Sequence, residues 1–114
     1  MTAALLALYL AAFARVESGG NYNAVGDHGN ARGCWQFHAT RWAEMGGNPA
    51  SFGRATKSEQ DAVMSRALQR YAATRPDDVD LTVWLGNWHN AGHGSARETA
   101  YTRKLRAALA EVAQ

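Results

Sequence analysis

The chain has few of the residues that would cross-link or stiffen it. Its 114 residues include one cysteine, Cys34, so no intramolecular disulfide can form. Because a tryptophan follows Cys34, we expect a small buried hydrophobic residue there rather than a nucleophile. Two prolines stand beside eleven glycines. This balance predicts flexible loops between helices and excludes a disordered or collagen-like chain.

Long apolar runs and runs of one charge are also missing. The most apolar stretch, "MTAALLALYLAAFA", is too short to span a bilayer. It lacks the basic start of a signal peptide, and cleavage after Ala14 would remove the helix that carries Glu17. Lys and Arg are scattered and the net charge is only +2, so no nucleic-acid partner is expected.

The spacing of apolar residues and glycines predicts about five helices. A first helix should end near Ser18, where two glycines follow. Residues 19–34 are rich in glycine and asparagine, which predicts a loop with a small hairpin around "GDHGN". The remaining predicted helices cover residues 40–45, 57–73, 81–90 and 96–112.

Capping residues predict where three of these helices begin. "TKSE" is a capping box with Thr56 as the N-cap, and "SARE" is a second one with Ser95 in that position. Asp78 or Asp80 should cap the helix that begins "LTVWL". Strand-like alternation is not convincing anywhere, so we expect one mostly helical domain over residues 1–114.

One carboxylate, Glu17, stands where an apolar helix meets the glycine-rich loop. Cleavage of an acetal needs a carboxylic acid that is still protonated near neutral pH, and burial raises the pKa of a carboxyl group. The carbonyl groups at a helix C-terminus disfavour the anion as well. Position alone leaves two interpretations open, namely a buried general acid and a solvated residue at the end of a helix.

Four blocks of sequence resemble the soluble lytic transglycosylases of the lysozyme-like superfamily. "VESGGNYNAVG" is similar to the family motif "ES-G-N-NA-V", and "ARGCWQF" to "A-GLMQ". "WHNAG" resembles "AYNAG", and "ETAYTRKL" resembles the closing motif "ET--YV-KV". The blocks follow the family's order over nearly the whole chain. The middle of the chain also resembles the resuscitation-promoting factors, which are small wall-cleaving domains of the same superfamily.

This resemblance implies a mainly α, lysozyme-like fold with about five helices around one cleft and a reduced or absent β-hairpin. It implies cleavage of the β-1,4 bond between N-acetylmuramic acid and N-acetylglucosamine, with a 1,6-anhydro product. The expected partner is the glycan strand of peptidoglycan, and the net charge suits such a wall polymer. Neither a cofactor nor a metal ion is expected, and the protein should be a monomer.

The resemblance also assigns roles by position. Glu17 would be the catalytic acid and base, and Tyr101 the tyrosine whose hydroxyl hydrogen-bonds it. Gln36 would line the cleft and bind the sugar N-acetyl group or the reacting region, while Asn90 would shape the cleft wall. Ser18 should stabilise the end of the helix. Further substrate-binding residues are expected to be Phe37, His89 and Asp27.

Three departures from the family pattern bear on these roles. His89 replaces the tyrosine of "AYNAG", and one residue fewer precedes Tyr101, which would displace its side chain. Gly26 stands where many transglycosylases have a serine, and Asp27 follows it. A second carboxylate in this loop is a feature of hydrolytic lysozymes, although a "GD-G" turn is also typical of an ordinary loop aspartate.

Two rival functions therefore stay open. The first is a hydrolytic lysozyme that uses Glu17 and Asp27. The second is a non-catalytic glycan-binding or phage structural module, which would not need a buried acid. A metal site at His89 and His93 is not expected, because the intervening "NAG" should break the helix. With no signal peptide predicted, the protein would reach the bacterial wall as a phage lysin, a virion component or a domain cut from a longer secreted protein.

Overall fold

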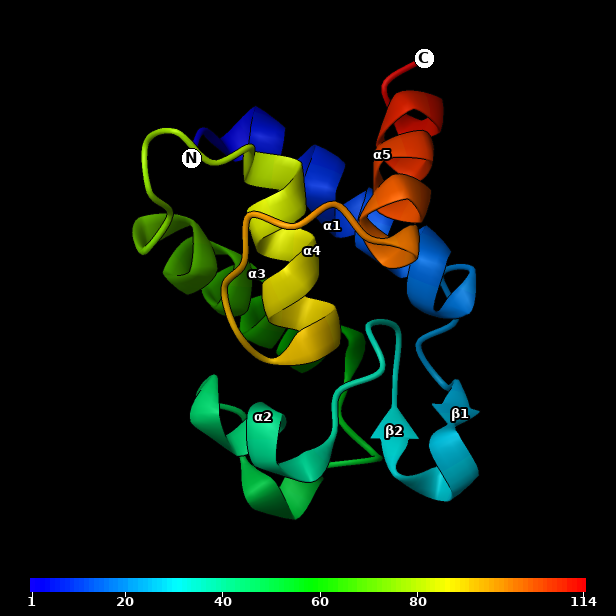
Figure 1. Cartoon of the computed structure of the whole chain (residues 1–114). Helices are drawn as coiled ribbons and strands as arrows, with labels where there is room; N and C mark the ends of the chain where they lie inside the picture. The colour runs from blue at the N-terminus through cyan, green and yellow to red at the C-terminus, as the bar shows by residue number, and fades with distance from the viewer.

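Helices make up most of the chain, and a short hairpin lies between the first and the second. The computed structural model describes all 114 residues. Its helices are α1 (Ala3–Ser18), α2 (Ala39–Glu44), α3 (Lys57–Ala73), α4 (Leu81–Ala91) and α5 (Ala100–Val112). In Figure 1 the four longer helices gather in one part of the molecule, and α2 with the hairpin forms the other. The expected mainly α architecture is confirmed and is consistent with a lysozyme-like fold.

Helix α1 ends where its sequence predicts, at Ser18. Thr2 is the N-cap, and its side-chain oxygen accepts a hydrogen bond from the Leu5 amide at 3.1 Å. The helix ends at Ser18 because Gly19 adopts a left-handed conformation with φ of 66°, which favours glycine. Tyr9 and Phe13 are buried on its inner face. Neither α1 nor any other helix is both long and apolar enough to cross a membrane.

The predicted small hairpin is present in the glycine-rich loop. Strands β1 (Val25–Gly26) and β2 (Ala31–Arg32) run antiparallel, with Val25 opposite Arg32 and Gly26 opposite Ala31. The 3₁₀ turn η1 (Asp27–Gly29) joins them. Each strand has only two residues, which is too few to produce a recognisable alternation in the sequence.

Helices α3 and α4 begin at capping residues that the sequence marks. At α3, the Thr56 side chain accepts from the Glu59 amide while the Glu59 carboxylate accepts from the Thr56 amide, as predicted. At α4 the cap is Asp80, whose carboxylate accepts from the Val83 amide at 3.0 Å. This bond holds the pKa of Asp80 below its ordinary value.

The prediction that Ser95 starts the last helix is wrong. Thr99 is the N-cap of α5, and its side chain and that of Thr102 each accept a hydrogen bond from the other residue's amide. The preceding segment is kept out of the helix by Asn87. Its side-chain amide donates to the carbonyl groups of Ser95 and Arg97, both at 2.9 Å. The Ser95 carbonyl, which would accept the first helical hydrogen bond, is therefore already engaged.

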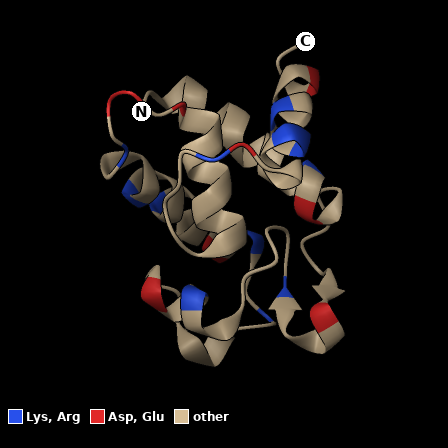
Figure 2. Cartoon of the chain, viewed as in Figure 1, with Lys and Arg blue, Asp and Glu red and all other residues tan.

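A single apolar core joins the helices. Its sixteen buried residues come from every helix and from the segment after β2. Cys34 belongs to this cluster, and burial raises the pKa of its thiol, so the expected small buried hydrophobic residue is confirmed. A short 3₁₀ turn, η2 (Pro49–Ser51), precedes α3. Lys and Arg are distributed over the helices and the hairpin rather than gathered in one place (Figure 2).

Candidate active site

Glu17 lies in the last turn of α1 with its side chain 19% exposed. The hydroxyl of Tyr101, from the first turn of α5, donates a hydrogen bond to Oε2 of Glu17. Gly86 lets α5 approach α4 closely at this level, because a Cβ there would come within 3.0 Å of Thr102 and 3.7 Å of the Tyr101 ring. The missing residue before Tyr101 therefore does not separate the two side chains.

Tyr101 is held as a hydrogen-bond donor. Burial raises the pKa of its hydroxyl, and the negative charge of Glu17 raises it further. The phenol consequently keeps its proton at physiological pH. An ionised carboxylate can only accept hydrogen bonds, and the Tyr101 hydroxyl is a donor placed to meet one of its oxygens.

His89 lies beneath the Glu17 carboxylate. Its side chain is 5% exposed, and its ring meets those of Phe13 and Phe37 edge-on. Nε2 is 2.8 Å from the Trp35 carbonyl oxygen and 3.9 Å from Oε2 of Glu17. Burial lowers the pKa of His89, although the Glu17 charge opposes this. The ring is thus neutral at physiological pH, and the contact with Glu17 is not an ion pair.

The neutral ring has a defined tautomer. A carbonyl oxygen can only accept, so Nε2 must carry the proton that His89 donates to Trp35. Nδ1 is then unprotonated, and it is buried without a hydrogen-bond partner in the protein. His89 therefore forms the floor of the site as an uncharged aromatic ring with one hydrogen bond, to the Trp35 carbonyl.

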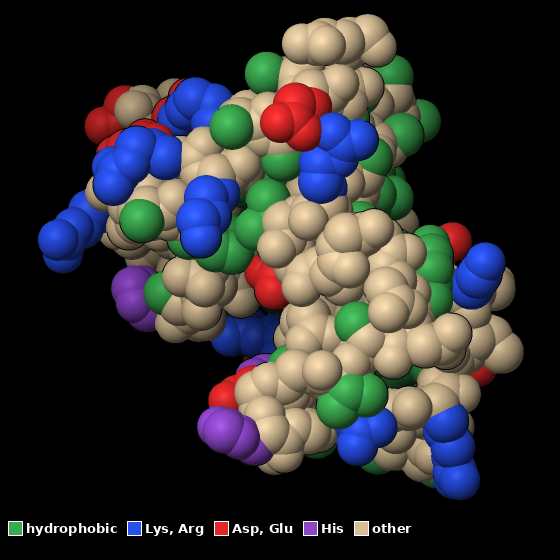
Figure 3. Space-filling view, turned by 90° about the vertical axis from the view of Figure 1, so that its right-hand side faces the viewer, with side chains coloured by type: hydrophobic (Ala, Val, Ile, Leu, Met, Phe, Trp, Pro, Cys, Tyr) green, Lys and Arg blue, Asp and Glu red, His purple; other side chains and the backbone are tan.

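These side chains border a cleft. A cavity of about 290 Å³ is lined by Glu17, Asp27, Ala31, Gln36, His38, His89 and Asn90. A neighbouring cavity of about 400 Å³ shares four of these residues and adds Phe37 and residues of α2. In the space-filling view, acidic and histidine side chains are visible at the hollow between the two parts of the molecule (Figure 3). Six of the seven residues predicted for the site line one or both cavities, and Tyr101 stands behind Glu17.

Gln36 and Phe37 interact mainly with other residues of the protein. Gln36 has a φ of 54°, and its side-chain amide nitrogen donates to the carbonyls of Gly33 at 2.8 Å and Ala24 at 3.3 Å. Its oxygen receives no hydrogen bond from the protein, and it lies so close to Gly26 that a Cβ there would be 2.3 Å away. Phe37 is 4% exposed and belongs mainly to the core.

Asp27 and Asn90 occupy the more open part of the cleft. Asp27 has a φ of 46°, and its carboxylate lies 3.2 Å from Nε2 of His38. Both side chains of this pair are slightly more than half exposed. Asn90 is exposed near the end of α4.

His38 is a cleft residue that sequence reasoning missed. It directly follows the "WQF" block, but no residue pattern connects it with Asp27 across the hairpin. Only the folded turn brings the two together. By contrast, the expected role of Ser18 is found: its hydroxyl donates to the Cys34 carbonyl at 2.7 Å and accepts from the Asn21 amide at 3.0 Å. Nowhere does the fold bring three His, Cys, Asp or Glu side chains together as metal ligands.

The arrangement places one carboxyl group at the base of an accessible cleft, between a permanent donor and a neutral ring. Such a group can give a proton to an oxygen atom bound in the cleft and take one back. Between two such transfers, the Tyr101 hydroxyl would donate its hydrogen bond to the anionic form. The site is therefore suited to acid and base catalysis by a single residue.

Comparison with known proteins assigns the first part of the chain to a family. A family model described as a transglycosylase-like domain matches residues 6–74, which is more than half of the chain. The match includes Glu17 and the hairpin and ends before α4. No curated protein and no solved structure matches the chain.

Proposed function

Because the chain belongs to the transglycosylase-like domain family, we propose that it is a lytic transglycosylase of peptidoglycan. Family membership supports a peptidoglycan-cleaving, transglycosylase-type activity and action at the cell wall. The finer proposal is cleavage between N-acetylmuramic acid and N-acetylglucosamine by one domain, residues 1–114, acting as a monomer. The observation that carries it is the Glu17 carboxyl group at the base of the cleft, bonded to Tyr101.

In the first step Glu17 gives its proton to the glycosidic oxygen. The bond from C1 of N-acetylmuramic acid to that oxygen breaks, and the N-acetylglucosamine part leaves with a new hydroxyl group. Positive charge develops at C1 and its ring oxygen. Glu17 is now an anion, which the Tyr101 hydroxyl stabilises.

In the second step the same carboxylate acts as a base. It removes the proton from the 6-hydroxyl of the muramoyl residue, and that oxygen forms a bond to C1, which closes the 1,6-anhydro ring. Glu17 is protonated again, and no water is consumed. One carboxylate is sufficient because the nucleophile belongs to the substrate.

Other cleft residues would bind the sugars. Since the Gln36 amide nitrogen is already engaged in the loop, its oxygen is the group left to accept the N–H of an N-acetyl group. Asn90 would border the sugar from α4. His89 and Phe37 would contribute the floor of the cleft rather than polar contacts, because both are buried.

A hydrolytic lysozyme is a second candidate, and one observation favours it. Asp27 lines the same cavity as Glu17, and its carboxylate lies 3.2 Å from Nε2 of His38. A hydrolase would need Asp27 to act on water or on the sugar. The carboxyl groups would then be about 5 Å apart in a retaining enzyme or about 6.5–9.5 Å apart in an inverting one.

Product analysis separates these functions. Purified peptidoglycan is digested with the protein, and the masses of the soluble fragments are measured by mass spectrometry. We expect 1,6-anhydro ends, which are lighter than reducing ends by one water molecule. Reducing ends that take up ¹⁸O from labelled water would identify a hydrolase. Tight binding without any fragments would identify a glycan-binding module.

A further inference from the structure

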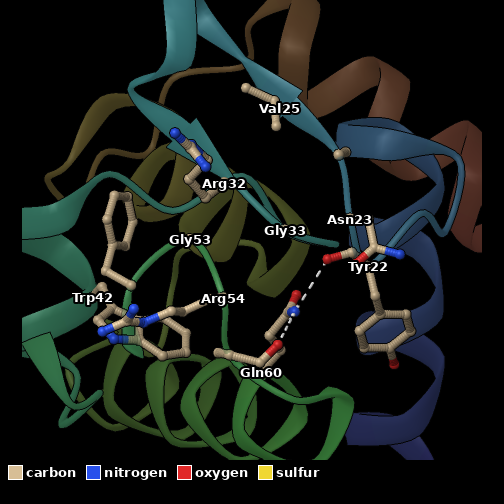
Figure 4. A pocket seen from close by; sticks show the side chains of 12 residues that line it. Tyr22, Asn23, Val25, Arg32, Gly33, Trp42, Gly53, Arg54 and Gln60 are labelled. Carbon is tan, nitrogen blue, oxygen red and sulfur yellow. Dashed lines mark hydrogen bonds between the residues drawn. The ribbon is translucent and has the colours of Figure 1, made fainter. Parts of the chain in front are cut away.

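A third cavity lies on the other face of the hairpin. It has a volume of about 420 Å³ and does not include Glu17. Val25 and Arg32, which are paired across the strands, line it, whereas the neighbouring Ala31 lines the Glu17 cleft. Successive residues of a strand point to opposite faces, so the two-residue strands act as a partition between the cavities. Figure 4 shows this cavity between the hairpin and the start of α3.

The walls of this cavity are partly apolar and accessible. Tyr22, Trp42 and Phe52 contribute aromatic side chains. At its edge Val25 is 62% exposed, which is unusual here because only one other large hydrophobic residue is exposed. Water-exposed apolar surface beside aromatic walls is typical of a ligand pocket.

Arg32 and Arg54 are the only charged residues that line this cavity. Nε of Arg32 donates to the Gly29 carbonyl at 2.8 Å, and Nε of Arg54 donates to the Ala50 carbonyl at 3.0 Å. These bonds orient the guanidinium groups, yet neither arginine forms an ion pair. None of the twelve lining residues is Asp or Glu.

Gly53 provides room for this arrangement. It lies between the two arginines in Figure 4 and has a φ of 83°. A Cβ at this position would stand 3.0 Å from Nη1 of Arg32. A larger residue would therefore both strain the backbone and press on the guanidinium group.

We propose that this cavity binds a peptide carrying free carboxylates, of the kind attached to the muramoyl residues of peptidoglycan. Guanidinium groups with free Nη donors match a carboxylate in geometry and charge. The apolar walls suit alanine methyl groups and aliphatic chains of such a stem peptide, and the volume is in the range of small-ligand pockets. The choice of this polymer rests on the proposed function, but the binding site itself does not depend on Glu17.

Binding can be measured without turnover. The ¹⁵N-labelled full chain is titrated by NMR with the synthetic tetrapeptide L-alanyl-γ-D-glutamyl-L-lysyl-D-alanine, and with the same peptide carrying amides in place of its carboxylates. We expect saturable shifts around Val25, Arg32 and Arg54 for the acid form, with a Kd on the order of 1 mM. Absence of saturable shifts, or equal binding of the amidated peptide, would overturn the proposal.

Charge variants show whether the cavity itself is responsible. Arg54→Glu should weaken peptide binding at least about 10-fold, whereas Arg54→Lys should retain most of it. The control is Arg103→Glu on α5, an exposed residue without an ion pair that gives the same change in net charge. Equal weakening by Arg103→Glu would mean long-range attraction only and would contradict the proposed site. Failure to cleave peptidoglycan would contradict the proposed function alone, since this measurement needs no cleavage.

Discussion

The cleft contains two carboxylates in contrasting surroundings. Glu17 is 19% exposed, belongs to a long helix and accepts a hydrogen bond from a second helix. The side chain of Asp27 is 54% exposed, belongs to a short turn and faces a histidine that is equally open to water. Packing fixes the first carboxylate, whereas solvent screens the second.

This difference bears on which carboxylate can direct a reaction. A catalytic group must be held to within about half an ångström, and side chains on packed helices meet this demand better than side chains on loops. Its hydrogen bonds are also stronger where water is excluded. The contrast therefore supports a mechanism in which Glu17 performs both proton transfers and Asp27 has a lesser part.

Removal of the buried carboxyl group should have the largest effect. Glu17→Gln keeps the size of the side chain but cannot transfer a proton, so activity on peptidoglycan should fall by about 10²-fold to 10⁴-fold. Turbidity clearance measures the loss, and circular dichroism checks that the fold is retained. Asp77→Asn, at an exposed position in the linker before α4, is the matched control and should be fully active. Clearance by Glu17→Gln at nearly the wild-type rate would contradict the assignment.

Removal of the Tyr101 hydroxyl, which contacts Glu17, should lower activity less than removal of the Glu17 carboxyl group does. Tyr101→Phe removes the donor that stabilises the Glu17 anion, and we expect activity to fall roughly 10-fold with little change in thermal stability. Tyr9→Phe is the matched control, because the Tyr9 hydroxyl is bonded to Thr82 at 2.7 Å in the core, away from the cleft. If Tyr101→Phe lowers the melting temperature by several degrees and keeps its activity per folded molecule, the hydroxyl is structural.

The buried histidine should affect stability in a pH-dependent way. Because the pKa of His89 is lowered in the fold, the unfolded chain binds the extra proton first. The contribution of neutral His89 to the free energy of unfolding is fully present above about pH 6.5, the ordinary pKa of histidine in an unfolded chain. It is lost as the pH falls toward the lower pKa that His89 has in the folded protein. Urea unfolding at about pH 7.5 and about pH 5.5 should show this loss in the wild type and much less of it in His89→Phe.

The same substitution has a second, constant cost. His89→Phe leaves the Trp35 carbonyl without its donor, which should lower stability by about 1–3 kcal/mol at both pH values. His93→Asn is the control, because His93 is exposed beyond the end of α4. If His89→Phe loses as much stability between the two pH values as the wild type does, a group other than His89 is responsible.

Local signals in the sequence were sufficient to predict most of the helical side of the cleft. The end of α1 at Gly19 and the cap at Thr56 depend on neighbouring residues, and the family pattern placed Tyr101 opposite Glu17. The start of α5 was missed because Ser95 and Thr99 both fit a capping pattern, and a distant side chain, Asn87, decides between them.

The hairpin side could not be predicted to the same extent. Asp27 and His28 both have positive φ, which no residue pattern indicates, and this turn brings His38 to Asp27. The cavity on the other face of the hairpin likewise depends on Arg32 of β2 and Arg54, from the segment before α3, lining the same space. Contacts of this kind arise from tertiary structure alone.

The most direct test of the contrast is the isosteric substitution of the exposed carboxylate, with both rate and product measured. For Asp27→Asn we expect the smallest effect, namely activity within a few-fold of the wild type on purified peptidoglycan. Mass spectrometry should find 1,6-anhydro ends from both proteins, because Glu17 and the 6-hydroxyl of the substrate are unchanged. Loss of activity in Asp27→Asn, together with reducing ends from the wild type, would contradict the account and make the protein a hydrolase that uses two carboxylates.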